Sequence, residues 1–169
     1  MKKIMLIAIL ITGFGWQATS QQISKNAIGL RIGDSDGFGP EVNYQRAIGE
    51  NNRLEFGLAW HSKKDWNAVK LTGIYQWVWQ IDGGFNWYAG PGAGFGLVSY
   101  DYYRYDKDYP PYPYKDKETD AYAFITGDIG IEYNFDFPLL ISLDFRPQFN
   151  LGYRDDVTFD VGLGARYQF

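Results

Sequence analysis

The sequence predicts an all-β fold, an eight-stranded antiparallel up-and-down transmembrane β-barrel, on three observations. Apolar and polar residues alternate at every second position from about residue 26 to the end of the chain. The composition, with 20 Gly and 19% aromatic residues, is poor for helices and good for strands. Short and longer connections follow one another in turn, as they do in membrane barrels.

The first residues have the pattern of a secretory signal peptide. Lys2 and Lys3 precede an apolar run over 4–16, and small residues follow up to Ser20. The apolar run is shorter than the about 20 residues that a membrane-spanning helix needs. We therefore expect export of the chain and cleavage after Ser20. The expected parts are a signal peptide, 1–20, and one barrel domain, 21–169.

The charge balance limits the partners that the exported part can have. Without Lys2 and Lys3 the formal net charge changes from −4 to −6. This acidic surplus argues against nucleic acid as a partner. The chain has no Cys, so neither a disulfide nor a lipid-modified cysteine is available to it.

Eight stretches of alternation predict the eight strands. In chain order they cover residues 26–33, 38–48, 53–61, 69–81, 85–98, 121–135, 139–150 and 157–169. The tight connections are 49–52, 82–84 and 135–138, and the more polar ones are 33–37, 61–67, 101–120 and 152–156. We expect the tight turns and both chain ends on the periplasmic side, and a long external loop at about 100–120.

The polar face of these strands is nearly neutral in charge, and this helps to decide whether the face points into the barrel or away from it. A soluble lipocalin-like barrel turns its apolar face inward, whereas a membrane barrel turns it toward lipid. Charges enclosed in a narrow lumen must be paired, because an unpaired one costs several kcal/mol. We therefore expect the five basic and six acidic residues of this face to form a lumen charge network: Arg31, Glu41, Arg53, Glu55, Lys70, Asp128, Glu132, Asp144, Arg146, Asp160 and Arg166.

Small residues on the same face support a filled lumen. Gly90, Gly92, Gly94 and Gly96 occupy successive polar-face positions of one strand. An eight-stranded barrel is just wide enough for side chains to fill it. We expect these glycines to leave room for long Arg and Glu side chains from other strands. The run 90–96 has no helix after it, so it is not a phosphate-binding loop.

The apolar face carries large aromatic residues near the predicted strand ends. Trp and Tyr favour the boundary between membrane and water, and so many rings would overfill a soluble ligand cavity. The predicted aromatic girdle consists of Trp60, Trp77, Trp79, Trp87 and Tyr133. An outward apolar face in contact with lipid is the better interpretation.

The last strand carries the most specific pattern. Apolar residues at every second position end on a terminal aromatic residue: Val161, Leu163, Ala165, Tyr167 and Phe169. Over roughly residues 24–169 the chain resembles the small eight-stranded outer-membrane barrels, the OmpA/OmpX-like family of porin-like proteins. The resemblance implies the outer membrane of a Gram-negative-type bacterium. It also implies that the last strand is the signal for the barrel-assembly machinery.

Catalytic and metal sites are not predicted, and neither is a cofactor. His61 is the only histidine, so a site with several histidines is excluded. His61 and Ser62 raise the alternative of a lipid-modifying barrel hydrolase, but consecutive strand residues point to opposite faces. A nucleophile and its base must lie within hydrogen-bond reach. We therefore interpret His61 as a residue at the loop mouth.

The segment 101–120 is the most distinctive part of the sequence. Prolines stiffen it and tyrosines supply contact area at low entropic cost. The predicted contact residues for a surface protein or glycan are Tyr103, Tyr105, Tyr109, Tyr112 and Tyr114. The interpretation that we favour is that strands five and six simply extend beyond the membrane as a solvated hairpin.

Taken together, these features predict a non-enzymatic integral barrel with a closed, charge-filled lumen. Its role would be structural or one of surface interaction through the external loops. A narrow porin-like channel for small solutes is the alternative. Outer-membrane lipid and the assembly machinery are the expected partners.

Overall fold

The computed structural model describes residues 23–35, 38–62, 66–104, 114–151 and 156–169. The predicted signal peptide, 1–20, lies outside them. Within the described residues, no helix is both long enough and apolar enough to span a membrane.

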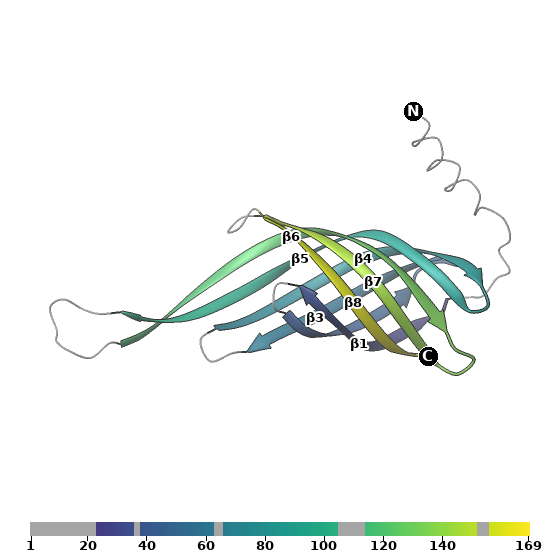
Figure 1. The fold of residues 1–169 in the computed structure, drawn as a ribbon, viewed down its shortest axis with the longest axis horizontal. Helices are drawn as coiled ribbons and strands as arrows, with labels where there is room; N and C mark the ends of the chain where they lie inside the picture. The colour runs from purple at the N-terminus through teal and green to yellow at the C-terminus, as the bar shows by residue number, and fades with distance from the viewer. Residues whose placement is uncertain (1–22, 36–37, 63–65, 105–113, 152–155) are drawn as a thin grey trace, which may run out of the picture.

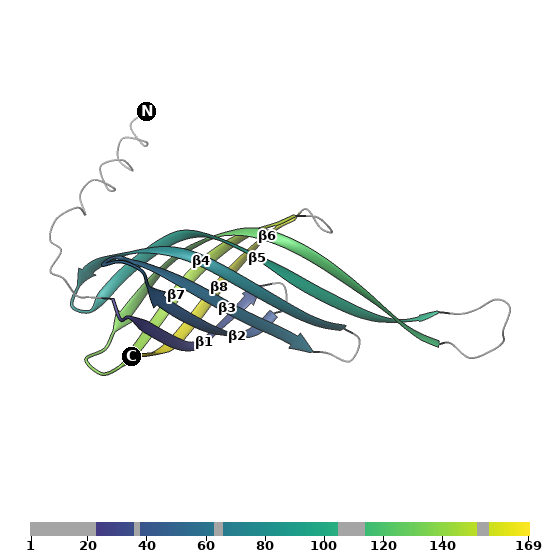
Figure 2. The same cartoon turned by 180° about the vertical axis from the view of Figure 1, so that it is seen from behind.

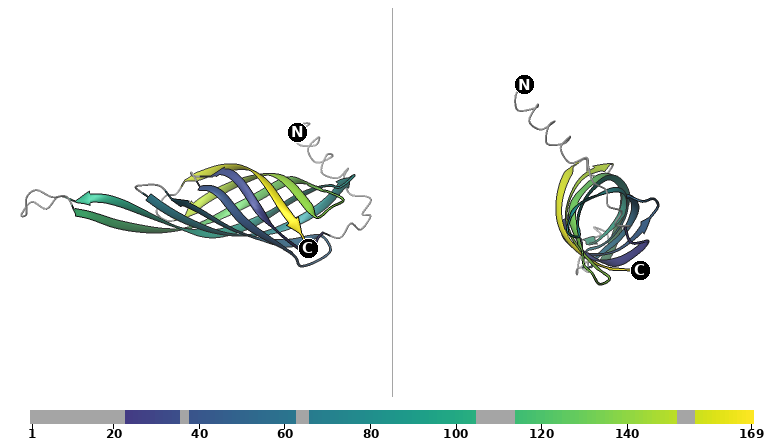
Figure 3. Two further views of the ribbon diagram at one scale, coloured as in Figure 1. Left: turned by 90° about the horizontal axis from the view of Figure 1, so that it is seen from below. Right: turned by 90° about the vertical axis from the view of Figure 1, so that its right-hand side faces the viewer.

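Eight strands form one closed antiparallel barrel, in which each strand pairs with the next and the last pairs with the first (Figure 1). The view along the long axis shows the closed ring (Figure 3). This confirms the predicted all-β, eight-stranded architecture. The strands are β1 (Asn26–Ser35), β2 (Phe38–Ala47), β3 (Asn52–Ser62), β4 (Trp66–Asp82), β5 (Phe85–Arg104), β6 (Tyr114–Asn134), β7 (Leu139–Leu151) and β8 (Val157–Gln168).

The connections separate the barrel into a turn end and a loop end. At the turn end, β4 and β5 are joined through Gly83 and Gly84, whose φ angles are 57° and 89°. A two-residue hairpin of this kind needs positive φ at both central positions, which glycine adopts without strain. The chain ends of the barrel meet at the same end, where the Asn26 N–H donates to the Phe169 carbonyl at 3.0 Å.

The barrel is apolar outside and polar inside. Outward-facing residues of β8 are largely exposed, as Phe159 (65%) and Leu163 (61%) show, whereas Arg166 on the inner face is 1% exposed. The same alternation holds on the long strands β4 and β7. The soluble, lipocalin-like alternative is therefore wrong for this chain, because the large apolar side chains point away from the barrel interior.

Strands β5 and β6 are the longest, with 20 and 21 residues, and form a hairpin that extends far past the rest of the barrel (Figures 1 and 2). The register places Asp101 opposite Lys117, and the hydroxyls of Ser99 and Thr119 lie 2.9 Å apart. The expectation that strands five and six extend as a hairpin is therefore confirmed, and much of the segment 100–120 that was expected to be a loop is paired strand. Opposite charges that face each other across two strands stabilise a sheet, and tyrosine favours strands. Both effects act outside a barrel as well as within it.

Candidate functional site

All eleven residues predicted to line the lumen are buried. Their exposed fractions lie between 1% and 6%, and within the described residues they are the buried charged side chains. They come from every strand of the barrel except β5, so residues far apart in the chain meet along its axis. The sequence pattern therefore identified the face correctly, and the structure adds which charge pairs with which.

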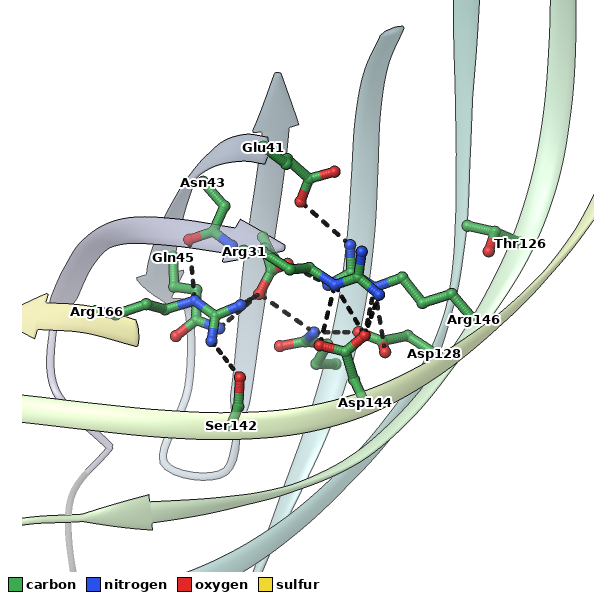
Figure 4. A network of polar contacts seen from close by, with 12 residues as sticks. Arg31, Glu41, Asn43, Gln45, Thr126, Asp128, Ser142, Asp144, Arg146 and Arg166 are labelled. Atoms are coloured by element: carbon green, nitrogen blue, oxygen red, sulfur yellow. Dashed lines mark hydrogen bonds and ion pairs between the residues drawn. The ribbon is translucent and has the colours of Figure 1, made fainter. Parts of the chain in front are cut away.

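Arg146 on β7 is the centre of the network (Figure 4). Its guanidinium reaches Glu55 at 2.5 Å and Glu41 at 3.3 Å, and its Nε lies 3.4 Å from both Asp128 and Asp144. Four carboxylates from four other positions of the wall thus converge on one cation. Such a cluster is stable only while the central positive charge is present.

Arg31 on β1 extends the network toward the loop end. It pairs with Asp144 through Nε at 2.8 Å and with Asp160 through Nη1 at 2.6 Å. Charge-assisted bonds from a planar guanidinium fix direction as well as energy, because the donors form a rigid fork. Arg31 therefore ties β1 to both β7 and β8 across the lumen.

Arg166 on β8 extends it toward the turn end. Its Nη2 donates to Glu55 at 3.1 Å, its Nε to Asn43 at 3.0 Å and its Nη1 to the Ser142 hydroxyl at 2.7 Å. Glu55 also accepts a bond from the Gln45 amide at 2.6 Å. Arg146 and Arg166 consequently share Glu55 between them.

A second layer lies nearer the turn end and is built on Arg53. This guanidinium forms a two-pronged pair with Glu132, at 3.1 and 2.7 Å, and its Nε donates to Gln76 at 2.6 Å. The Arg53 guanidinium carbon also lies 4.8 Å from the centre of the Tyr88 ring. Gln76 links the layers, since its amide donates to Asp128 at 2.5 Å.

The neutral partners of this network were not among the predicted site residues. Gln45, Gln76, Asn43 and Ser142 are all buried, and Tyr88 is fully buried. Each occupies an inward position of the same period-two pattern that identified the charges. Their inward positions in the alternating pattern, rather than their charge, would therefore have identified them from the sequence.

The glycines on β5 make room for other side chains than the Arg and Glu side chains that the sequence predicted. A Cβ at Gly96 would collide with the Tyr122 ring, and one at Gly94 would collide with Phe124. These glycines therefore make room for aromatic rings of β6, because strand register puts Tyr122 and Phe124 directly opposite them. The glycines that make room for ionic side chains lie elsewhere: Gly33 and Gly162 beside Arg31, Gly57 beside Glu41, and Gly164 beside Arg166.

A small cavity lies at the loop end of the network. Its volume of about 10 Å³ is room for about one water molecule. Its lining residues are Arg31, Glu41, Lys70, Thr72, Phe124, Thr126, Arg146, Gln148 and Asp160. The Lys70 ammonium lies 5.7 Å from the centre of the Phe124 ring and donates to Gln148 at 3.4 Å.

His61 and Ser62 do not form a catalytic pair. The His61 ring stacks on Trp66 with centroids 4.3 Å apart, whereas the Ser62 hydroxyl donates to the Asn67 side chain at 2.7 Å. The two side chains therefore engage different neighbours at the loop end of β3 and β4. The described part of the chain also contains no group of three or more His, Cys, Asp or Glu side chains placed to hold a metal ion.

The five predicted girdle residues face outward but lie at two levels. Trp77, Trp79, Trp87 and Tyr133 lie toward the turn end, where Trp79 and Trp87 stack with ring centroids 4.2 Å apart. Trp60 lies at the opposite end, near the end of β3. The aromatic band is therefore densest toward the turns.

The predicted assembly residues form the outward face of the closing strand. Val161, Leu163, Ala165 and Tyr167 are exposed, and Phe169 follows the last residue of β8. Seven consecutive register pairs join β8 to β1. The sequence that the family resemblance marks as an assembly signal is therefore also the strand that closes the ring.

The predicted contact tyrosines fall partly outside the described residues. Tyr103 pairs in register with Lys115, and Tyr114 pairs with Arg104, so the backbone of both lies in the hairpin. Tyr105, Tyr109 and Tyr112 lie outside the described ranges.

Comparison with known proteins places the fold. No family model and no curated protein matches the chain. Solved structures do match: the N-terminal β-barrel domain of Pseudomonas aeruginosa OprF (14% identity, TM-score 0.55) covers 88% of this chain and 98% of its own. The chain has the OmpA/OmpX-like barrel fold.

Two further barrels agree over nearly their whole length. Ail, the attachment invasion locus protein of Yersinia pestis, shares 15% identity at a TM-score of 0.56 and covers 86% of this chain and 97% of its own. Neisserial surface protein A shares 11% identity at a TM-score of 0.55, covering 85% and 94%. The OmpA/OmpX-like barrel thus arises here from a sequence in which few positions are shared, because the fold depends on alternation and register.

Proposed function

We propose that this chain is an integral outer-membrane barrel with a closed lumen, whose role is to present the β5–β6 hairpin at the cell surface. It has no catalytic function in this proposal. The observation that carries the proposal is the inverted barrel, with its apolar residues outside and a paired ionic network inside. The likeness in fold to three outer-membrane barrels supports the location.

The outer wall is suited to lipid and unsuited to water. Large apolar residues, 36–65% exposed, lie on seven of the eight strands, for example Leu30, Phe95 and Val161, and Ile48 follows the end of β2. A contiguous apolar surface of this size is incompatible with a soluble monomer. Aromatic residues near the strand ends fit the boundary between hydrocarbon and headgroups. Insertion into a bilayer removes this surface from water.

The ionic network supports a closed lumen. A solute that crossed the barrel would have to separate Arg146 from four carboxylates and Arg53 from Glu132. Breaking a buried pair costs about 3–5 kcal/mol because it leaves an unpaired charge in a medium of low dielectric. The narrow porin-like alternative rests on the small loop-end cavity, which holds about one water molecule.

Planar-bilayer recordings test the closed lumen. We expect the purified barrel to show no steady conductance at moderate voltage, because the network fills the axis. A matched Arg146→Ala barrel, if it folds, should show brief openings. Large, steady openings of the unaltered barrel would establish the channel and contradict the closed lumen.

The hairpin is the part best placed to meet a partner. β6 pairs with β5 over its whole length, but within the described residues its pairing with β7 begins only at Ala123. The edge of β6 over 114–122 therefore has backbone donors and acceptors available for an extended segment of another protein. One structural neighbour, Ail, is named as an attachment protein.

Replacing residues 99–119 with a two-residue turn between Val98 and Asp120 tests this role, because it removes most of the exposed edge of β6. We expect the shortened barrel to fold, because the ionic network and the barrel-forming part of every strand remain. Cells that display the shortened barrel should no longer bind to arrays of proteins or glycans. The matched control shortens a different connection, 63–65, at the same end. Binding that persists without the hairpin would contradict the proposed role while leaving the barrel itself intact.

A further inference from the structure

The β5–β6 hairpin beyond the barrel has one strand edge that pairs with no described residue (Figures 1 and 2). β6 pairs with β5 along its whole length, whereas its pairing with β7 begins at Ala123, opposite the end of β7 at Leu151. Successive residues of a strand direct their N–H and C=O alternately to its two sides. Over 114–122, every second residue of β6 therefore directs its backbone groups to the side on which the structure describes no strand.

The two faces of this hairpin differ in chemistry. Residues that pair in register lie on the same face of a sheet. One face carries two rows that run from β4 across β5 to the free edge of β6: Trp66, Tyr100 and Glu118 in the first, and Ala68, Val98 and Asp120 in the second. The other face carries two hydroxyls, of Ser99 and Thr119, and the register pair of Asp101 with Lys117. Each row of the first face thus ends on a carboxylate at the free edge.

Among the side chains that the structure describes, the sheet places no cation beside Glu118 or Asp120 on their face. Their partners in register on β5 are Tyr100 and Val98, and the next residue of β6 on that face is Tyr122. The lysine on the other face differs, because it already has a carboxylate opposite it in register. The remaining neighbouring position for Glu118 and Asp120 is the free side of β6. A cation at that position would face two carboxylates.

Charge decides which strand fits this edge. Antiparallel pairing of two copies centred on Thr119 would bring Glu118 of one copy opposite Asp120 of the other, and like charges opposite each other destabilise a sheet. An acidic segment meets the same repulsion. A segment with Lys or Arg at two positions separated by one residue would pair with both carboxylates, because side chains share a face at every second residue. The intervening residue would fall on the other face, beside Thr119, where an uncharged side chain fits.

We propose that the free edge of β6 binds an extended basic segment of another protein as an added strand, whose Lys or Arg residues at alternate positions pair with Glu118 and Asp120. Backbone hydrogen bonds give such an added strand its affinity, and the side chains beside it give selectivity. The inference rests on the proposed role of the hairpin at the cell surface, and it names the class of partner. Binding therefore depends on the order of the positive charges as well as on their number.

Peptide binding to the purified barrel in phosphatidylcholine nanodiscs tests this site, since the lipid has no net charge. Three labelled nine-residue peptides of Thr and three charged residues are the probes. The first has Lys at alternate positions, the second has Lys at every third position, and the third has Glu at alternate positions. Fluorescence anisotropy measures their dissociation constants. We expect the first peptide to bind about threefold tighter than the second, and the third to bind least, because only the first presents neighbouring cations on one face of a strand.

Two double variants separate the site from general attraction between charges. Glu118→Gln with Asp120→Asn removes both carboxylates, and we expect the first peptide to bind this barrel about tenfold more weakly. Glu50→Gln with Asp136→Asn is the matched control, because it removes the same charge from exposed positions in the turns at the other end. The control should bind the peptide as the unaltered barrel does. Gel mobility without heating checks that each barrel is folded.

Three outcomes would overturn the inference. Equal binding of the first peptide by the unaltered barrel and by the Glu118→Gln, Asp120→Asn barrel would show that these carboxylates do not select the partner. Equal binding of the two lysine peptides would show that the number of charges matters and strand pairing does not. Dimers of the unaltered barrel that exclude the peptide would assign the edge to a second copy.

Failure of the inference can be told apart from failure of the proposed function. If removal of residues 99–119 abolishes binding to the arrays but neither lysine peptide binds, the hairpin meets a partner of another chemistry and only the inference is wrong. If binding to the arrays survives that removal, the proposed role of the hairpin is itself wrong.

Discussion

An Arg146→Met barrel should be less stable than the unaltered barrel by about 3–5 kcal/mol. The substitution keeps a long unbranched side chain in the lumen but removes the one charge that Glu41, Glu55, Asp128 and Asp144 share. Four carboxylates would then face each other in an enclosed space. Urea unfolding of the barrel refolded in vesicles, followed by tryptophan fluorescence and by gel mobility without heating, measures the change.

Two further variants separate charge from packing. Lys117→Met removes an exposed charge from the external hairpin, where an ion pair contributes about 0–1 kcal/mol, so its urea midpoint should barely move. Adding Glu41→Gln and Asp128→Asn to Arg146→Met should recover part of the lost stability, because both changes remove unpaired negative charge. A triple variant no more stable than Arg146→Met would show that packing rather than charge determines the loss.

A Gly90→Ala barrel should lose about 1–3 kcal/mol, the usual effect of overfilling a packed site. A Cβ at this position would overlap the backbone carbonyl of Tyr75 on β4, and a backbone group cannot rotate away as a side chain can. The strands β4 and β5 would have to separate locally. The same urea titration measures the effect.

Gly73→Ala provides the matched control for that substitution. Gly73 lies on the neighbouring strand β4, and the nearest atoms to an added Cβ are 3.9 Å away. Its urea midpoint should change by no more than about 0.5 kcal/mol in equivalent stability. Equal losses in both variants would mean that glycine itself, rather than the close approach of the two strands, is required.

The fold and the composition of the lumen could be predicted from the sequence because both follow from a single period. Side chains along a strand point alternately to the two faces of the sheet. The alternating pattern of each strand therefore indicates which of its residues share a face. Arg31 and Asp160 could be assigned to the same interior although 129 residues separate them. That assignment needed only the position of each residue in the inward and outward alternation.

The pairing inside the lumen could not be predicted in the same way. Which carboxylate meets Arg146 depends on the stagger between strands, and that stagger adds up around the ring from every turn and register. Five cations and six anions allow many arrangements that look equally good along the chain. The contacts of Tyr88 with Arg53 and of Tyr122 with Gly96 depend on the same stagger.

The length of the hairpin was underestimated for a different reason. The tyrosines, aspartates and lysines around residues 101–120 are polar on both faces, so alternation in hydrophobicity disappears once the strands leave the membrane-like part of the wall. Cross-strand pairs such as Asp101 with Lys117 maintain the sheet where no hydrophobic face does. Alternation of apolar and polar residues cannot indicate a strand that is exposed to water on both faces.

The seam between β1 and β8 sets the order in which the molecule can be completed. Its two partners lie at opposite ends of the polypeptide, with Ala27 opposite Gln168. Until β8 is in place, a sheet of β1 to β7 remains open, with unpaired backbone groups along the edges of β1 and β7. Closure by β8 is therefore the step that removes the open edges through which the sheet could pair with another chain.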